Sequence, residues 1–215
     1  MTNVKVVKAE WVSKPTWSEF GSKLLDLESC LGKTNFDSIH MTRWFEYPWV
    51  YDTLGPFNPE DVVLDAGPGN TALQFLISKQ VKEVHSLDLC QEYVDWTTKT
   101  KDERGFTNLF PRFGDILASP YPNDYFDKVI CISVLEHIRK DKVSQAMNEL
   151  VRMVKPNGKM VITMDVAYGQ TDNQVTMTDF EQIMDGQFRA PSSETSVFSV
   201  DGIQFSVICM LLGKV

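Results

Sequence analysis

The chain has 215 residues, of which 43% are hydrophobic and 23% charged, and this composition suits one globular domain with a sizeable core. Its formal net charge of -8 at pH 7 repels phosphate backbones, so we expect no nucleic-acid partner. No apolar run approaches the roughly 18 residues of a membrane span, so we expect no membrane partner. The cysteines lie far apart without a CxxC pair, which favours a cytoplasmic protein without a disulfide framework. They are Cys30, Cys90, Cys131 and Cys209.

The first residues of the chain are rich in tryptophan and differ from the rest. We interpret residues 1–55 as a helical extension packed on a core domain of residues 56–215, because alone they would bury too little surface. Four polar or aromatic residues of this segment recur every three or four positions or stand next to each other, which predicts one face of a short helix that ends before Pro48. As a lid, this helix would reach a bound ligand and exclude water; the alternative is a helix that only packs on the core. The residues on the face are His40, Arg43, Glu46 and Tyr47.

From about residue 60 onward, short apolar runs alternate with amphipathic stretches, as expected of βα units around a parallel sheet. The predicted strands are 62–64, 84–87, 109–113, 127–133 and 159–166, and the predicted helices are 71–79, 92–100 and 143–154, with another opening at Thr178. A turn at Pro156-Asn157-Gly158 ends the third of these helices. Asp201-Gly202, between two apolar runs, predicts a β-hairpin. The sequence therefore predicts an α/β, Rossmann-like fold: a mostly parallel seven-stranded sheet with helices on both faces and a C-terminal antiparallel hairpin.

The most specific pattern is a strand that ends in Asp65 and turns through Gly67 and Gly69 into a helix. Glycines are needed in such a turn because side chains would keep a ligand away from the backbone. Asp88 ends the next strand, 19 residues beyond Gly69, where it can accept hydrogen bonds from a ribose diol. The pattern predicts a ribose-containing ligand; the alternative is an ordinary turn with an exposed aspartate.

Two residues of this turn discriminate between ribose-containing ligands. Through Ala72 the loop formally fits the Gly-x-Gly-x-x-Ala pattern of dinucleotide sites. Pro68, however, has no N–H to offer a pyrophosphate. The negative charge of Asp65 suits the cationic amino-acid end of S-adenosylmethionine instead. We therefore favour S-adenosylmethionine and keep a nicotinamide dinucleotide as the alternative.

With these motifs the chain resembles the class I S-adenosylmethionine-dependent methyltransferases, in particular the small-molecule subgroup called type 11. The resemblance is good over residues 60–159 and extends to the rest only by layout. Thr71 departs from it, because the family commonly has a third glycine there. The matching segments are Asp65-Ala66-Gly67-Pro68-Gly69, Leu87-Asp88-Leu89, Gly114-Asp115-Ile116, 127–138 and 154–159.

The resemblance implies S-adenosylmethionine as cofactor and S-adenosylhomocysteine as product. It also implies that Asp115 accepts a hydrogen bond from the adenine amino group and that the Ile116 amide donates one to the adenine ring. The cofactor-binding residues that we expect are Asp65, Ala66, Gly67, Pro68, Gly69, Thr71, Asp88, Leu89, Gly114, Asp115, Ile116, Ser133, Val134 and His137.

His137 is the one candidate for catalysis. It follows the fourth predicted strand, on the edge where open α/β sheets bind ligands, and could contact the cofactor or accept a proton from an acceptor hydroxyl. The alternative is a histidine that only packs at a helix start. Asp165, at the end of the fifth strand, is a candidate for acceptor contact, or else a solvated strand end. The lid and acceptor candidates are His40, Arg43, Trp44, Tyr47 and Asp165.

Signatures of several other classes are absent from the sequence. Ser133-Val134-Leu135-Glu136 differs from the Asn/Asp-Pro-Pro-Tyr/Phe signature of amino-directed nucleic-acid methyltransferases, and no metal-ligand cluster is found, so we expect no metal. We expect methyl transfer to an oxygen or nitrogen of a small molecule, by a monomer or homodimer. Residues 1–55, 167–176 and 184–194 would select the acceptor. A nicotinamide-dependent oxidoreductase, which would need a hydride-transfer constellation, and a non-catalytic cofactor-binding protein stay as alternatives.

Overall fold

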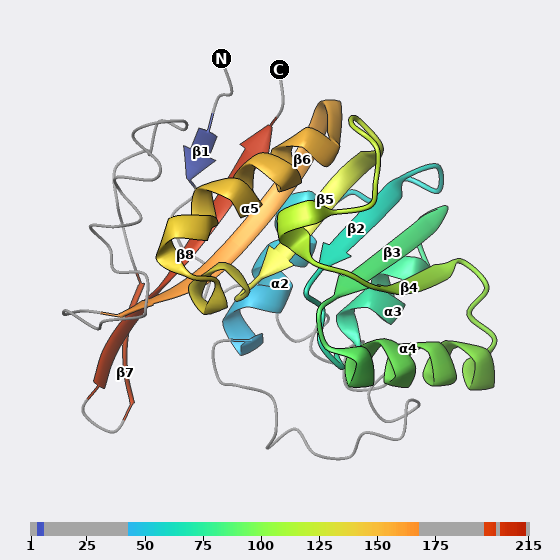
Figure 1. Cartoon of the computed structure of the whole chain (residues 1–215), viewed down its shortest axis with the longest axis horizontal. Helices are drawn as coiled ribbons and strands as arrows, with labels where there is room; N and C mark the ends of the chain where they lie inside the picture. Colours follow the sequence, from blue (N-terminus) through green and yellow to red (C-terminus); the bar gives the residue numbers. More distant parts are fainter. Residues whose placement is uncertain (1–3, 7–42, 168–195, 201–202, 214–215) are drawn as a thin grey trace.

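The computed structural model describes residues 4–6, 43–167, 196–200 and 203–213. Five parallel strands form one twisted sheet from its β4 edge inward, in the order β6-β5-β2-β3-β4 (Figure 1). The predicted α/β fold with a mostly parallel sheet is therefore confirmed. The strand bounds are β2 Val62–Ala66, β3 Glu83–Asp88, β4 Leu109–Phe113, β5 Phe126–Ile132 and β6 Val154–Ala167.

Antiparallel strands extend the sheet beyond β6. Strand β8 (Ile203–Gly213) pairs with β6, and both β1 (Val4–Val6) and β7 (Ser196–Val200) pair with β8. The short strand β1 lies in residues 1–55, the segment that the sequence analysis predicted to be a helical extension. The described residues form eight strands in this sheet, one more than the seven predicted. The C-terminal hairpin stays a prediction, because the turn at residues 201–202 lies outside the described residues.

Helices cover both faces of the sheet, and each face has its own hydrophobic core. On one face, α5 (Lys140–Met153) buries Val143, Met147 and Leu150 against alternate residues of β2, β5 and β6. On the other face, α2 (Arg43–Leu54) and α3 (Leu73–Ser78) pack against the intervening residues of the same strands. This division follows from the alternation of side chains along a strand. Helix α4 (Gln91–Arg104) reaches the second core through Trp96, whose ring packs edge-on against Phe75.

Helix α2 corrects one expectation from the sequence. The helix does not end before Pro48 but continues through it to Leu54. A proline removes one N–H from the helical ladder and its ring crowds the carbonyl group four residues earlier, so it often kinks or ends a helix. Tyr47, Trp49 and Val50 are buried in the core around it, and this apolar burial holds the helical turn on both sides of the proline.

The start of β6 corrects a second expectation. The strand begins at Val154, five residues before the predicted start, and contains the predicted turn as an irregular insertion. Its pairing with β5 shifts from Phe126↔Val154 to Lys128↔Lys159. Asn157 adopts a φ of 64°, which an asparagine tolerates better than most residues. The Pro156-Asn157-Gly158 segment therefore makes a bulge within the pairing rather than a separate turn.

Candidate functional site

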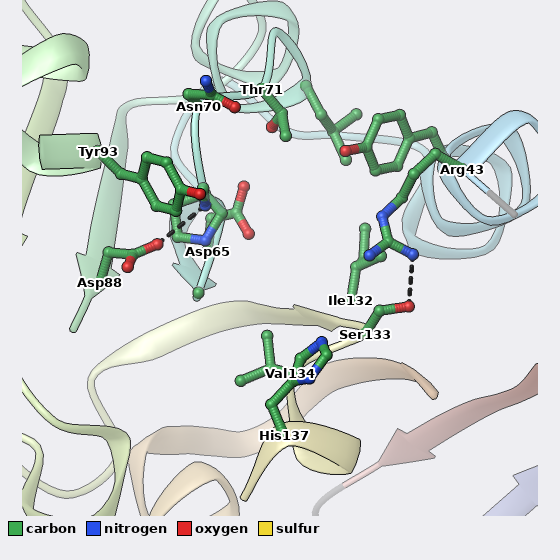
Figure 2. A pocket seen from close by; sticks show the side chains of 15 residues that line it. Arg43, Asp65, Asn70, Thr71, Asp88, Tyr93, Ile132, Ser133, Val134 and His137 are labelled. Carbon is green, nitrogen blue, oxygen red and sulfur yellow. Dashed lines mark hydrogen bonds between the residues drawn. The ribbon is translucent and has the colours of Figure 1, made fainter. Parts of the chain in front are cut away.

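Two adjoining cavities lie at the carboxyl ends of β2, β3 and β5, the edge where open α/β sheets bind ligands. The first cavity, of about 400 Å³, lies between the glycine turn and helix α2 (Figure 2). The second cavity, of about 310 Å³, lies beside the residues after β4. Both cavities are lined by Gly67, Asp88, Val134 and His137.

The glycine turn after β2 is shaped by a close approach to Val134, the second residue after β5. Gly67 has a φ of 73°, and its N–H donates to the Leu87 carbonyl oxygen over 2.8 Å. A Cβ atom on Gly67 would lie 2.5 Å from a methyl carbon of Val134. A side chain at this position would therefore meet both backbone strain and a clash. Gly67 and Val134 together make the boundary that the two cavities share.

Asp88 fastens the glycine turn to the end of β3. One of its carboxylate oxygens accepts a hydrogen bond from the Gly69 N–H over 2.9 Å, and the other accepts one from the Cys90 N–H over 2.8 Å. The first of these bonds is drawn in Figure 2. A carboxylate has about four lone-pair positions, so these two bonds leave acceptor capacity on the cavity side.

Asp65 is a buried carboxyl group in the wall of the first cavity. Only 3% of its surface is exposed. Burial, and second the charge of Asp88, raises the pKa of Asp65 to about 7. A cation bound in the cavity would favour the charged form and reverse this shift. The site is therefore suited to a positively charged group beside Asp65.

Helix α2 supplies the opposite wall of the first cavity. Arg43 donates to Glu46 and to the Ser133 hydroxyl group. Burial alone would lower the pKa of Arg43, but the adjacent Glu46 carboxylate raises it above its ordinary value, so the guanidinium stays charged. Tyr47, which is buried, lines the same cavity as Thr71 of the glycine turn. Arg43 and Tyr47 thus both line the cavity, on the side facing Asp65.

The second cavity is bounded by the turn after β4. The Gly114 N–H donates to the Asp88 carbonyl oxygen over 3.0 Å, and a Cβ atom on Gly114 would lie 2.6 Å from a methyl carbon of Leu87. Asp115 caps the 3₁₀ turn Ile116–Ala118 by accepting from the Leu117 N–H over 2.8 Å. Leu89, with 65% of its surface exposed, adds an apolar flank.

The structure brings nearly all the predicted cofactor residues to these cavities; Ala66 is the exception, because it is fully buried in the core. His137 lies in the 3₁₀ turn Leu135–His137, is exposed, and lines both cavities, whereas Leu135 is buried. Asp165 lines neither cavity, and its N–H donates to Glu136 over 3.1 Å. His40, the side chain of Trp44, the helix expected from Thr178, and the acceptor segments 168–176 and 184–194 lie outside the described residues.

Some lining residues were not predicted from the sequence. Tyr93, in the first turn of α4, places its ring 4.0 Å from where a Cβ atom on Gly69 would stand. An aromatic residue so soon after the acidic strand end could have indicated that Tyr93 lies at the site. Arg139 and Lys142 flank the second cavity from the start of α5, and nothing in their spacing indicated that they would line a cavity. Among the described residues no group of histidine, cysteine, aspartate or glutamate could hold a metal ion, and none of the described helices is long and apolar enough to cross a membrane.

Comparisons with known proteins agree with this architecture. The family described as methyltransferase domain matches residues 64–162. An uncharacterized methyltransferase of Bacillus subtilis, YcgJ, is 32% identical over 105 residues, which are 48% of this chain and 40% of that protein. The ubiquinone biosynthesis O-methyltransferase of Rickettsia conorii is 29% identical over 102 residues, 47% of this chain and 34% of that protein. The chain thus spans less than half the length of the curated relatives that it matches first.

Solved structures share the fold at low sequence identity. The YcgJ structure has a TM-score of 0.66 at 15% identity, covering 78% of this chain and 97% of that one. The geranyl diphosphate C-methyltransferase of Streptomyces coelicolor A3(2), solved with S-adenosyl-L-homocysteine, has a TM-score of 0.68 at 14% identity, covering 94% and 99%. The fold and the glycine turn define a nucleotide-type α/β domain. More specifically, the fold is that of the class I S-adenosylmethionine-dependent methyltransferases, and residues 64–162 are similar to the methyltransferase domain family, as the sequence motifs indicated.

The two bonds that Asp88 accepts lead to a first prediction. Asp88→Ala should weaken S-adenosylhomocysteine binding at least about tenfold, because it removes both the acceptor for a ribose diol and the tie to Gly69, each charge-assisted bond being worth roughly 1.5–3 kcal/mol. Isothermal titration calorimetry measures the effect. The control is Asp95→Ala, which removes an exposed aspartate of α4 that bonds only its neighbour Gln91. Equal affinity in the wild type and the Asp88 variant would contradict a role for Asp88 in binding the ribose.

The exposure of His137 leads to a second prediction. His137→Asn should leave the melting temperature within a few degrees, since exposed substitutions usually cost under about 0.5 kcal/mol. It should lower affinity for S-adenosylhomocysteine several-fold, through lost contact in the shared part of the cavities. The matched control, His85→Asn, should lower the melting temperature without that loss, because His85 packs among Phe110, Tyr121 and Phe126. The reverse pattern would make His137 a packing residue.

Proposed function

We propose that this chain is an S-adenosylmethionine-dependent methyltransferase with a small-molecule acceptor. The observation that carries the proposal is the arrangement of three acids along the adjoining cavities: Asp65 in the first, Asp88 in the part they share, and Asp115 in the second. That order matches the cationic amino-acid end, the ribose diol and the adenine amino group of the cofactor. Each group would meet an acceptor of suitable charge or hydrogen-bonding capacity.

The same walls assign the residues that would hold each part of the cofactor. Asp65 would bind the ammonium group, and Arg43, across the first cavity, the carboxylate of the methionine end. Asp88 would accept from the ribose hydroxyls. In the second cavity Asp115 would accept from adenine and the Ile116 amide would donate to its ring, while Leu89 covers the ring face.

When bound, S-adenosylmethionine supplies an electrophilic methyl group on its sulfonium sulfur. The residues of this chain then have two tasks, to orient the reacting groups and to exclude water, which together account for about 7–11 kcal/mol of a typical barrier. Helix α2 serves both tasks at the methionine end, where Tyr47 and Arg43 wall the first cavity. His137 contacts the cofactor, and it is also the one side chain we nominate to accept a proton from an acceptor hydroxyl.

We further propose that residues 1–55 form a lid and that residues 56–215 form the methyltransferase domain. The acceptor is a small molecule methylated on an oxygen or a nitrogen, and the protein works in the cytoplasm as a monomer or homodimer. The first cavity, of about 400 Å³, supports a small acceptor, because this volume lies in the range of small-molecule sites. The net charge of -8 supports a neutral or cationic one.

A nicotinamide dinucleotide fits the cavities less well. Pro68 offers no N–H to a pyrophosphate, and the buried Asp65 would face the phosphate charge. The binding test is therefore a choice between two ligands.

Calorimetry should detect S-adenosylhomocysteine binding at micromolar concentrations and no binding of NAD. Incubation with labelled S-adenosylmethionine and a small-molecule metabolite extract should then yield labelled product. Micromolar NAD binding without S-adenosylhomocysteine binding would overturn the proposal. Binding without transfer to any extract would favour the non-catalytic alternative.

The raised pKa of Asp65 gives a pH prediction. In the free protein Asp65 loses its proton near pH 7, and only the charged form pairs with an ammonium group. Affinity for S-adenosylhomocysteine should therefore be highest near pH 8 and fall below pH 7, approaching tenfold per pH unit, with proton release on binding at pH 6. Calorimetry in buffers of different ionisation enthalpy measures both effects. Asp65→Asn should bind more weakly at pH 8 and lose this pH dependence; an unchanged pH profile would mean that Asp65 does not pair with the ligand.

A further inference from the structure

Glu46 of helix α2 is a fully buried carboxylate with three side-chain partners. None of its surface is exposed. Its oxygens accept hydrogen bonds from Arg43, from the Ser133 hydroxyl group over 2.7 Å, and from the Thr163 hydroxyl group. Ser133 follows β5 and Thr163 lies in β6, so this one side chain joins α2 to two neighbouring strands.

Two of these three partners line the first cavity, whereas Glu46 itself does not. Arg43 and Ser133 both face the cavity, and Arg43 bonds Ser133 as well as Glu46, so the three side chains form a closed triangle (Figure 2 shows the Arg43–Ser133 side). Ser133 has a φ of 48°, an uncommon conformation for a serine, which turns the chain into the cavity directly after β5. The triangle therefore fixes the direction in which Arg43 meets a ligand.

A buried carboxylate with this geometry is costly unless its charge and its hydrogen bonds are all satisfied. Packing alone does not require an acid at this position, because α2 already buries Tyr47, Trp49, Val50 and Leu54 against the core. The acid instead gives Arg43 one defined orientation. A flexible arginine would lose side-chain entropy each time it bound an anion, and a held arginine does not.

We propose that Glu46 is a positioning residue, which holds Arg43 and Ser133 in the geometry that binds the carboxylate at the methionine end of the cofactor. The inference rests on the proposed function, because it takes S-adenosylmethionine as the ligand. It goes beyond the proposed function because it assigns a positioning role to Glu46. This residue does not line the cavity and lies outside residues 64–162, the part matched by the methyltransferase family.

Two probes separate positioning from general stability. S-adenosylhomocysteine carries the amino-acid end, and 5′-methylthioadenosine has the same adenosine and thioether without that end. A loss of positioning at Glu46 affects only the first probe. A loosened fold affects both, because both use Asp88 and the second cavity. Comparing the two dissociation constants therefore isolates the contribution of the amino-acid end of the ligand, including its carboxylate, to binding.

Two substitutions separate position from charge. Glu46→Asp keeps the negative charge on a side chain that is one methylene group shorter. The carboxylate then no longer reaches Arg43, Ser133 and Thr163 together. Glu46→Gln removes the charge, and by electrostatics alone it should strengthen the attraction of Arg43 for a carboxylate. The matched control is Glu136→Gln, the same change at a nearby half-buried glutamate that accepts a hydrogen bond from the Asp165 N–H.

We expect both Glu46 variants to bind S-adenosylhomocysteine about tenfold more weakly than the wild type, and 5′-methylthioadenosine within about twofold of it. Glu136→Gln should bind both probes as the wild type does. The inference is overturned if both Glu46 variants retain or gain affinity for S-adenosylhomocysteine, or if the two probes weaken together. A wild-type protein that binds neither probe would instead refute the proposed function.

Discussion

The site depends first on the bond between the Asp88 carboxylate and the N–H of Gly69. Parallel strands bring their carboxyl ends to one edge of a sheet, but the turns that leave those ends still need to be held together. Asp88 holds the turn after β2 to the end of β3, while the carbonyl oxygen of the same residue accepts from Gly114 of the turn after β4. One residue thus fixes the relative position of three turns, and the two cavities lie between them.

The central βα units could be predicted from the sequence because each is specified by local patterns. Buried parallel strands give continuous apolar runs, and β4 was predicted with its observed bounds. The glycine turn identified Asp65 and Asp88, and the family resemblance identified Asp115; all three line the cavities. Pro48 and the Pro156-Asn157-Gly158 segment misled the prediction of boundaries, because tertiary burial and strand pairing outweighed local turn preferences.

The partners of α2 could not be predicted, because they depend on pairs far apart in the sequence. Nothing around Glu46 indicates that it meets Ser133 and Thr163, which lie 87 and 117 residues later. Thr71, which departs from the glycine common in related sequences, lines the first cavity together with Tyr47 of α2, and nothing in the sequence near either residue indicates this. Residues of this kind look like ordinary helix or turn residues until a fold brings them together.

The burial of α2 has a consequence for modularity. Leu54, at the end of the helix, is fully buried among residues of α3 and the sheet, and the helix also completes one wall of the first cavity. A fragment that began at residue 56 would expose an apolar sheet face along with that wall. Any exchange of the N-terminal segment therefore has to supply an equally apolar helix at this place, because the sheet face beneath it is otherwise uncovered.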